Sequence, residues 1–207
     1  MMDAAPGFSL PVMETFDSIQ GEGFHAGTPA FFIRLGGCDI GCHWCDVKES
    51  WDQDAHSILS IDEIVERAKS TSAQKIIVTG GEPLMYTLNT LTEKLKANKF
   101  KLHLETSGAY PLSGEWDWIC LSPKKNKEPL PEIFTKANEL KMIIFNKDDF
   151  RFAEKMASVI GHLSSVNLFL QPEWSRRDEM LPQIIEYVKQ HPQWRISLQT
   201  HKYLGVR

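Results

Sequence analysis

The stretch AFFIRLGGCDIGCHWCD, residues 30–46, carries the strongest structural signal in the chain. It begins as an apolar and aromatic run typical of a buried β-strand and ends in cysteines spaced C-x3-C-x2-C. A structural zinc site and an ordinary four-iron, four-sulfur cluster each take four protein ligands. Cys38, Cys42 and Cys45 therefore predict a metal centre with one position left open, on the loop that follows a strand.

Strand-like and helix-like segments alternate along the rest of the chain, as in parallel βα units. Further strands are expected at residues 75–80, 100–108, 117–124, 141–146, 166–172 and 194–202. Helices are expected at residues 61–69, 88–97, 148–160 and 179–190, the first after a capping box formed by Ser60 and Glu63. A complete eight-fold barrel takes about 250 residues. The 207 residues therefore predict one α/β domain, residues 1–207, that forms an incomplete TIM-like βα barrel.

Polar clusters follow nearly every expected strand. They read Gly-Gly-Cys, Thr-Gly-Gly-Glu-Pro, Glu-Thr-Ser-Gly, Ser-Pro-Lys, Gln-Pro and Gln-Thr-His-Lys. Parallel barrels build their active sites from the loops after the strands, so we expect these clusters to meet at one mouth. Cys120 stands apart in an apolar segment and is interpreted as a buried strand thiol.

The composition favours a small ligand as the partner. A net charge of −4 and 42% hydrophobic residues give no indication of nucleic acid or an anionic membrane. Residues 1–16 lack the basic and apolar regions of a signal peptide, and no later run approaches the ~20 apolar residues that span a bilayer. We expect a cytoplasmic protein, in which the clustered cysteines bind metal rather than form disulfides.

The cysteine spacing resembles that of the radical S-adenosylmethionine (SAM) superfamily, and further motifs resemble its 7-carboxy-7-deazaguanine synthases. These motifs are SIQGEG at 18–23, FIRLGGC at 32–38, ETSG at 105–108, SPK at 122–124, LQP at 170–172 and QTHKYLG at 199–205. They occur in the expected order over essentially the whole sequence. The resemblance thus implies a barrel of the radical SAM type.

The resemblance also implies a reaction and its cofactors. The reaction is the conversion of 6-carboxy-5,6,7,8-tetrahydropterin to 7-carboxy-7-deazaguanine with loss of ammonia, in queuosine and 7-deazapurine biosynthesis. A [4Fe-4S] cluster on the three cysteines would bind SAM through its open iron, and the SAM would be regenerated after each turnover. A homodimer and an electron donor such as flavodoxin are implied as partners.

Two alternatives remain for a protein of this size with three clustered cysteines. An activating enzyme for a glycyl-radical protein has the same spacing, but it needs an open groove for a protein loop. An electron-transfer or zinc-binding module would need no substrate pocket, and the missing fourth ligand argues against it.

The resemblance assigns site residues by motif. It implies substrate contacts from Ile19, Gln20, Gly21, Arg34, Thr79 and Arg207. Gln20 and Glu22, on a Gly-punctuated loop, can also supply donors and acceptors for the pterin edge, with a solvated turn as the alternative. Cofactor contacts are expected from Gly80, Gly81, Glu82, Ser107, Ser122, Pro123, Lys124 and Gln171. Arg34 is the only charged residue in its apolar strand, and a guanidinium offers the parallel donors that a carboxylate needs. His201 is a candidate catalytic acid, with a strand-end histidine bonded to the backbone as the alternative.

One position departs from the family pattern. Family members that bind Mg²⁺ usually carry Thr or Ser two residues after the last cysteine, where this chain has Val47. Valine has no oxygen for the ion, although substrate oxygens, water and Asp46 can supply ligands. The sequence therefore leaves the need for Mg²⁺ open.

Overall fold

The computed structural model describes residues 8–161 and 166–207. All of its named strands belong to one nine-stranded sheet, in the order β3-β1-β2-β4-β5-β6-β7-β8-β9. The strands are β1 Ser9–Ile19, β2 Pro29–Leu35, β3 Ser57–Ser60, β4 Lys75–Gly80, β5 Lys101–Thr106, β6 Trp118–Leu121, β7 Glu139–Ile144, β8 Asn167–Pro172 and β9 Trp194–Ile196. The helices are α1 Ile61–Lys69, α2 Asn89–Ala97, α3 Pro131–Phe134, α4 Asp148–Ile160, α5 Arg177–Gln190 and α6 Thr200–Leu204.

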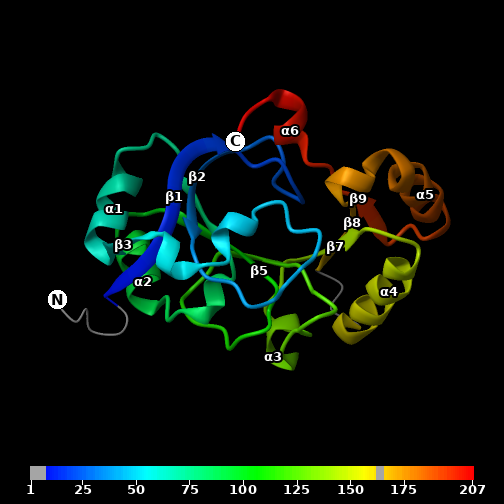
Figure 1. Ribbon diagram of the computed structural model, residues 1–207, viewed down its shortest axis with the longest axis horizontal. Helices are drawn as coiled ribbons and strands as arrows, with labels where there is room; N and C mark the ends of the chain where they lie inside the picture. The colour runs from blue at the N-terminus through cyan, green and yellow to red at the C-terminus, as the bar shows by residue number, and fades with distance from the viewer. Residues whose placement is uncertain (1–7, 162–165) are drawn as a thin grey trace.

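The strand directions confirm an incomplete TIM-like barrel. From β2 to β9 every neighbouring pair is parallel, whereas β1 is antiparallel to both β2 and β3. The strand order begins at β3 and ends at β9, so the sheet does not close on itself. Figure 1 shows α1 and α2 at one end of the long axis and α4 and α5 at the other.

Apolar residues on the strands and one face of each long helix form the core. In α1 the buried residues are Ile61, Ile64, Val65 and Ala68, and the predicted capping box of Ser60 and Glu63 is present. Each large side chain buried in this way contributes about 1.5–3 kcal/mol. Cys120 lies buried in β6, as predicted. This packing fixes the strands and hence the loops at their ends.

The structure corrects several expected segments. β1 and β3 were not predicted. In β1, Pro11 and several polar residues weaken the strand pattern. The strand expected at 194–202 ends at Ile196, and the chain turns into α6. Residues 1–16 show no signal-peptide pattern in the sequence, and residues 1–7 of that segment lie outside the described residues. Among the described helices, none has the length and apolar character of a transmembrane segment.

Candidate active site

A cavity of about 400 Å³ opens at the carboxyl ends of the parallel strands. Residues from the loops after β1, β2, β4, β5, β6 and β8 line it, together with residues just before and within α6. Every predicted site residue except Pro123 lies in this lining: Cys38, Cys42, Cys45, Ile19, Gln20, Gly21, Glu22, Arg34, Thr79, Gly80, Gly81, Glu82, Ser107, Ser122, Lys124, Gln171, His201 and Arg207. The expected convergence of the strand-end clusters is confirmed.

The cysteine loop leaves β2 and is held in place through its main chain. The Gly37 amide donates to the Ser50 carbonyl at 2.7 Å, and the Cys38 amide donates to the Trp51 carbonyl at 3.1 Å. Within the loop, the Cys45 amide donates to the Cys42 carbonyl at 3.0 Å. The three cysteine side chains are half-buried and line the cavity.

The donor set of this loop fits an iron–sulfur cluster. Burial raises the pKa of the Cys38 and Cys42 thiols, so a bound cation is needed to keep them deprotonated at neutral pH. Within the described ranges, no group of three or more His, Cys, Asp and Glu side chains is placed to hold a single metal ion. Three thiols on one loop at the wall of a cavity instead suit a larger, polynuclear centre.

The Gly-Gly-Glu turn after β4 lies against the start of the cysteine loop. Gly80 has a φ of +134°, and a Cβ there would stand 2.2 Å from the Leu35 carbonyl oxygen, so only glycine fits. A Cβ on Gly81 would meet the Gly37 carbonyl oxygen at 2.0 Å. The turn therefore brings bare backbone to the edge of the cavity beside the cysteines.

Glu82 is buried directly behind this turn and ties it to the end of β5. Its carboxylate accepts hydrogen bonds from the Leu84 amide, the Thr106 hydroxyl, and both the amide and the hydroxyl of Ser107. These four bonds use the acceptor sites that a carboxylate offers. In the Gly-Gly-Glu turn, the partly exposed backbone of Gly80 and Gly81 is therefore the part that a ligand in the cavity can reach.

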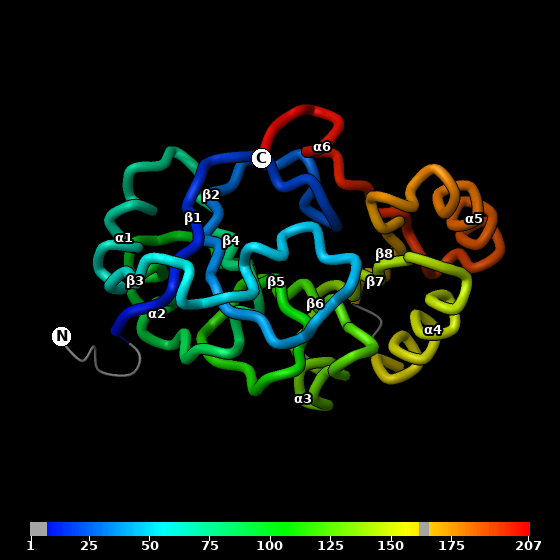
Figure 2. Tube along the Cα trace, viewed as in Figure 1, coloured from blue at the N-terminus to red at the C-terminus, as the bar shows by residue number. Residues whose placement is uncertain are grey.

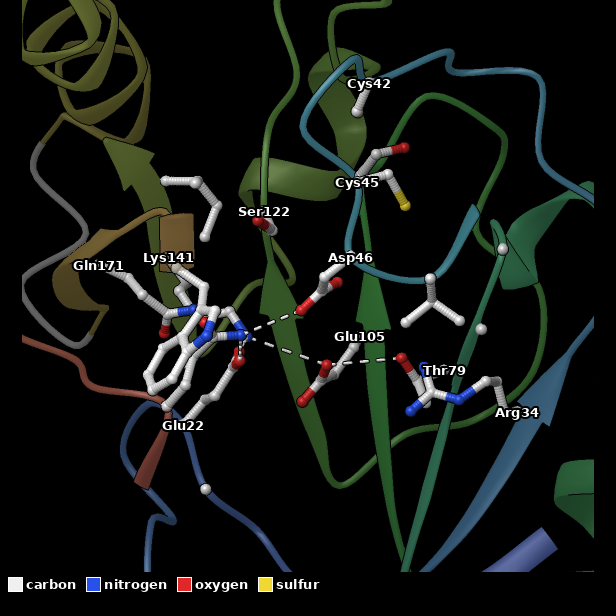
Figure 3. A pocket seen from close by; sticks show the side chains of 18 of the residues that line it. Glu22, Arg34, Cys42, Cys45, Asp46, Thr79, Glu105, Ser122, Lys141 and Gln171 are labelled. Carbon is white, nitrogen blue, oxygen red and sulfur yellow. Dashed lines mark hydrogen bonds and ion pairs between the residues drawn. The ribbon is translucent and has the colours of Figure 1, made fainter. Parts of the chain in front are cut away.

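A buried ion-pair network forms one side of the cavity (Figure 3). The ammonium of Lys141, whose side chain is 5% exposed, pairs with Glu22 and lies 3.9 Å from Glu105. Glu105 also accepts from the Gln20 side chain at 2.8 Å and from the Thr79 hydroxyl at 3.5 Å. Sequence reasoning missed Lys141 and Glu105 as site residues. Lys141 could have been found in the same way as Arg34, because it is also a charged residue in an apolar strand.

The network keeps the carboxylate of Glu22 charged. Burial favours the neutral form of Glu22, but the Lys141 charge and hydrogen bonds from Lys141 and Gln199 bring its pKa down to about 2. Burial would likewise lower the pKa of Lys141, but the surrounding carboxylates raise it well above its usual value. At neutral pH the cavity therefore presents the ionised carboxylate of Glu22 on this side.

The loop at residues 20–23 is fixed by both neighbouring and distant parts of the chain. The Glu22 amide donates to the Gln20 side-chain oxygen at 3.0 Å, and the Gly23 amide donates to the Ser197 hydroxyl at 2.9 Å. From α6, the Thr200 amide donates to the Gly21 carbonyl at 2.9 Å. Figure 2 shows the red C-terminal segment beside this blue N-terminal region.

His201 sits on α6 rather than at a strand end, which corrects the sequence interpretation. A Cβ on Gly21 would stand 2.0 Å from its Nδ1 atom, so glycine is needed there for the ring to fit. Burial lowers the pKa of His201, which keeps its imidazole neutral at pH 7. No protein group in residues 8–161 or 166–207 hydrogen-bonds its ring, so the backbone partner of the alternative interpretation is absent from the described residues.

Asp46 and Val47 lie beside the cysteines in the cavity wall. The Asp46 carboxylate accepts from Lys202 at 2.9 Å and from Gln199 at 3.3 Å. Its charge is thus already compensated by Lys202 on α6.

The partial barrel and the open three-cysteine loop define a radical SAM enzyme. The Radical SAM superfamily profile matches residues 32–121. The chain is 56% identical to the 7-carboxy-7-deazaguanine synthase of Flavobacterium psychrophilum over 200 residues, which cover 97% of this chain and 94% of that protein. It is 51% identical to the Synechocystis enzyme of the same name over 199 residues, 96% of this chain and 94% of the relative. The chain belongs to the 7-carboxy-7-deazaguanine synthase family.

The similarity extends to a solved structure. The crystal structure of QueE from Escherichia coli superposes with a TM-score of 0.82 at 30% sequence identity. The match covers 92% of this chain and 93% of that chain. Membership of the superfamily implies a [4Fe-4S] cluster and SAM, in agreement with the thiols of the cysteine loop.

Proposed function

We propose that this chain converts 6-carboxy-5,6,7,8-tetrahydropterin to 7-carboxy-7-deazaguanine and ammonia. The observation that carries the proposal is the charge distribution across the cavity: Glu22 and Arg34 lie on opposite sides, with Glu105 and Thr79 between them (Figure 3). A carboxylated pterin carries N–H donors on its pyrimidine edge and an anion on its other ring. Carboxylate acceptors facing a guanidinium suit both ends of such a molecule.

The residues of the chain have separate tasks in this proposal. Glu22 and Glu105 accept hydrogen bonds from the pyrimidine edge, and Arg34 donates to the carboxylate. Cys38, Cys42 and Cys45 would hold the [4Fe-4S] cluster, and the backbone of Gly80 and Gly81 would border bound SAM. When bound, the cluster supplies the electron that cleaves SAM. The neutral His201, beside Gly21, is the candidate for moving a proton.

The proposal extends to the state of the protein in the cell. Residues 1–207 would act as one radical SAM domain, since a single sheet contains every described strand. Thiols that must stay reduced favour the cytoplasm. A flavodoxin-like donor and a homodimer complete the proposal, and light scattering of the purified protein tests the dimer.

Anaerobic turnover with the reconstituted enzyme tests the reaction. With SAM, a reductant and the carboxylated tetrahydropterin, we expect equal amounts of 7-carboxy-7-deazaguanine and ammonia and little loss of SAM. A glycyl-radical activating enzyme would instead consume SAM stoichiometrically with its protein partner. Consumption of SAM without release of ammonia would contradict the proposed function.

A further inference from the structure

Glu14 places its carboxylate between two arginines at the edge of the cavity. It lies on β1 directly opposite Arg34 on β2, and its Oε1 accepts from the Arg34 Nε at 2.9 Å. Its Oε2 pairs with a terminal nitrogen of Arg207. The Glu14 and Arg34 side chains are each 20% exposed, so both are largely withdrawn from solvent. Nothing in the sequence motifs assigned a role to Glu14.

The bond to Nε determines which part of Arg34 remains free. A guanidinium can bind a carboxylate along its Nε edge or through the fork of its two terminal nitrogens. Glu14 occupies the Nε edge, and the ring of Phe16 lies 5.8 Å from the guanidinium carbon. In the described part of the chain, no other protein group accepts a hydrogen bond from Arg34. Its terminal fork is thus available to a ligand in the cavity.

The same carboxylate also holds the last residue of the chain. The Arg207 guanidinium pairs with Glu14 and lies 5.0 Å from the Phe16 ring, while the Ser18 hydroxyl donates to the Arg207 carbonyl oxygen. Phe16 is itself stacked on Phe32 at 5.1 Å between ring centroids. Glu14 therefore connects Arg34 to the C-terminal residue that lines the cavity.

We propose that Glu14 is a positioning residue for recognition of the substrate carboxylate: by binding the Nε edge of Arg34, it directs the terminal guanidinium fork to that carboxylate and retains Arg207 beside it. This inference rests on the proposed function, because it takes a carboxylated pterin as the ligand of Arg34. It predicts that Glu14 affects binding of the carboxylate and leaves binding of the pterin ring unaffected.

Two stable aromatic ligands isolate the carboxylate contribution. 6-Carboxypterin and pterin differ only in that group, and their affinities can be measured by calorimetry on the reconstituted, unreduced enzyme with SAM, where no turnover occurs. In Glu14→Gln the dissociation constant for 6-carboxypterin should rise about tenfold, since a charge-assisted contact loses its geometry. The constant for pterin should stay within about twofold of wild type, because no donor or acceptor for the ring is changed.

Two further variants separate positioning from a general structural effect. In an Arg34→Lys background, which has no fork to orient, adding Glu14→Gln should change 6-carboxypterin binding less than about twofold. Glu66→Gln removes an exposed ion pair with Lys69 on α1, away from the cavity, and should bind both ligands like wild type. Equal weakening of both ligands by Glu14→Gln, or no weakening of either, would overturn the inference.

The outcomes also distinguish this inference from the proposed function. A wild-type enzyme that forms product, together with a Glu14→Gln variant that discriminates the two ligands normally, would refute the role of Glu14 alone. A wild-type enzyme that binds neither pterin and releases no ammonia would refute the proposed function itself.

Discussion

Lys141 is the buried charge on which one side of the cavity depends. Lys141→Met would leave Glu22 and Glu105 as neighbouring, largely buried carboxylates, 15% and 23% exposed, without their cation. Removing one partner of a buried ion pair costs about 3–5 kcal/mol. We therefore expect a loss of that order in the free energy of unfolding at pH 7, measured by urea denaturation.

A charge-preserving variant is the control for this prediction. Lys141→Arg keeps a cation beside Glu22 and should lose much less stability than Lys141→Met. The penalty of Lys141→Met should also shrink near pH 4, where the unpaired carboxylates can take up protons. A Lys141→Met protein that unfolds at the wild-type urea concentration at pH 7 would show that the network contributes nothing to folding.

Val47 allows a test of metal dependence. Its side chain cannot coordinate Mg²⁺, and the neighbouring Asp46 is already paired with Lys202 at 2.9 Å. We expect turnover by the chelator-treated enzyme to be nearly insensitive to added Mg²⁺. Val47→Thr adds one hard oxygen of the kind that Mg²⁺ prefers and should make turnover dependent on the ion.

Folding of the Val47→Thr protein must be compared with wild type by circular dichroism. Val47 is half-buried in the cavity wall, and a hydroxyl there that is shielded from water without a partner would cost up to roughly 1–3 kcal/mol, which alone would reduce activity. Strong activation of the unmodified enzyme in a Mg²⁺ titration would mean that substrate, water or Asp46 binds the ion without a side chain at position 47.

At the scale of single elements, the middle of β5 contains a histidine that resists protonation. Burial, the nearby imidazole of His25 and the charge of Lys75 lower the pKa of His103 from 6.5 to about 3. Between about pH 3 and pH 6.5, the unfolded chain therefore binds a proton at His103 that the folded chain does not bind. The free energy of unfolding should therefore decrease as the pH falls from about 6.5 toward 3, by up to about 1.4 kcal/mol per pH unit.

His103→Phe keeps an aromatic ring in β5 and removes the titrating group. Urea unfolding at pH 7 and pH 5, above the usual range of carboxylate titration, compares the two proteins. The variant should lose less stability than wild type over this interval. If His103→Phe and wild type lost the same stability between pH 7 and pH 5, the pH dependence would belong to other groups. His25 is one of them, because burial also lowers its pKa.

The elements that the sequence predicted well are those with a continuous apolar pattern. β4 and α1 follow such patterns and have the predicted bounds, residues 75–80 and 61–69, and β2 begins one residue before the apolar run that starts at residue 30. β1 was missed because Pro11 and polar residues without a regular alternation interrupt its strand pattern. α6 was missed because five residues are too few to show a repeating helical pattern. The Thr200 hydroxyl donates to the Gly21 carbonyl, so a distant loop helps to hold this short helix in place.

At the scale of the whole molecule, the sequence predicted which loops meet but not how they are connected. The rule that active sites form after parallel strands was sufficient to bring the predicted residues together. The pairing of Glu22 with Lys141 and Gln199, and the sharing of Glu14 by two arginines, were not predictable. These contacts depend on the way that the β1–β2 loop and the C-terminal segment cross the mouth of the barrel.

The connection between the loop at residues 20–23 and the C-terminal segment also has a consequence for folding kinetics. The contacts of Gly23 with Ser197 and of Gly21 with Thr200 span 174 and 179 residues of sequence. Such long-range contacts form late, after the local βα units. Ser197→Ala should therefore accelerate unfolding and leave the refolding rate unchanged in stopped-flow experiments on the cluster-free chain. Slower refolding of this variant would place the contact in the folding nucleus.

During synthesis, a chain that folds in this order can build most of its sheet while still attached to the ribosome. The wall of the cavity that contains Gln199, His201 and Lys202 can only be added once these residues have left the exit tunnel. Cys38, Cys42 and Cys45 line the same cavity, so without that wall we expect them to be open to solvent from one more side than in the finished protein. This interval would give iron–sulfur assembly factors their widest access to the cysteine loop.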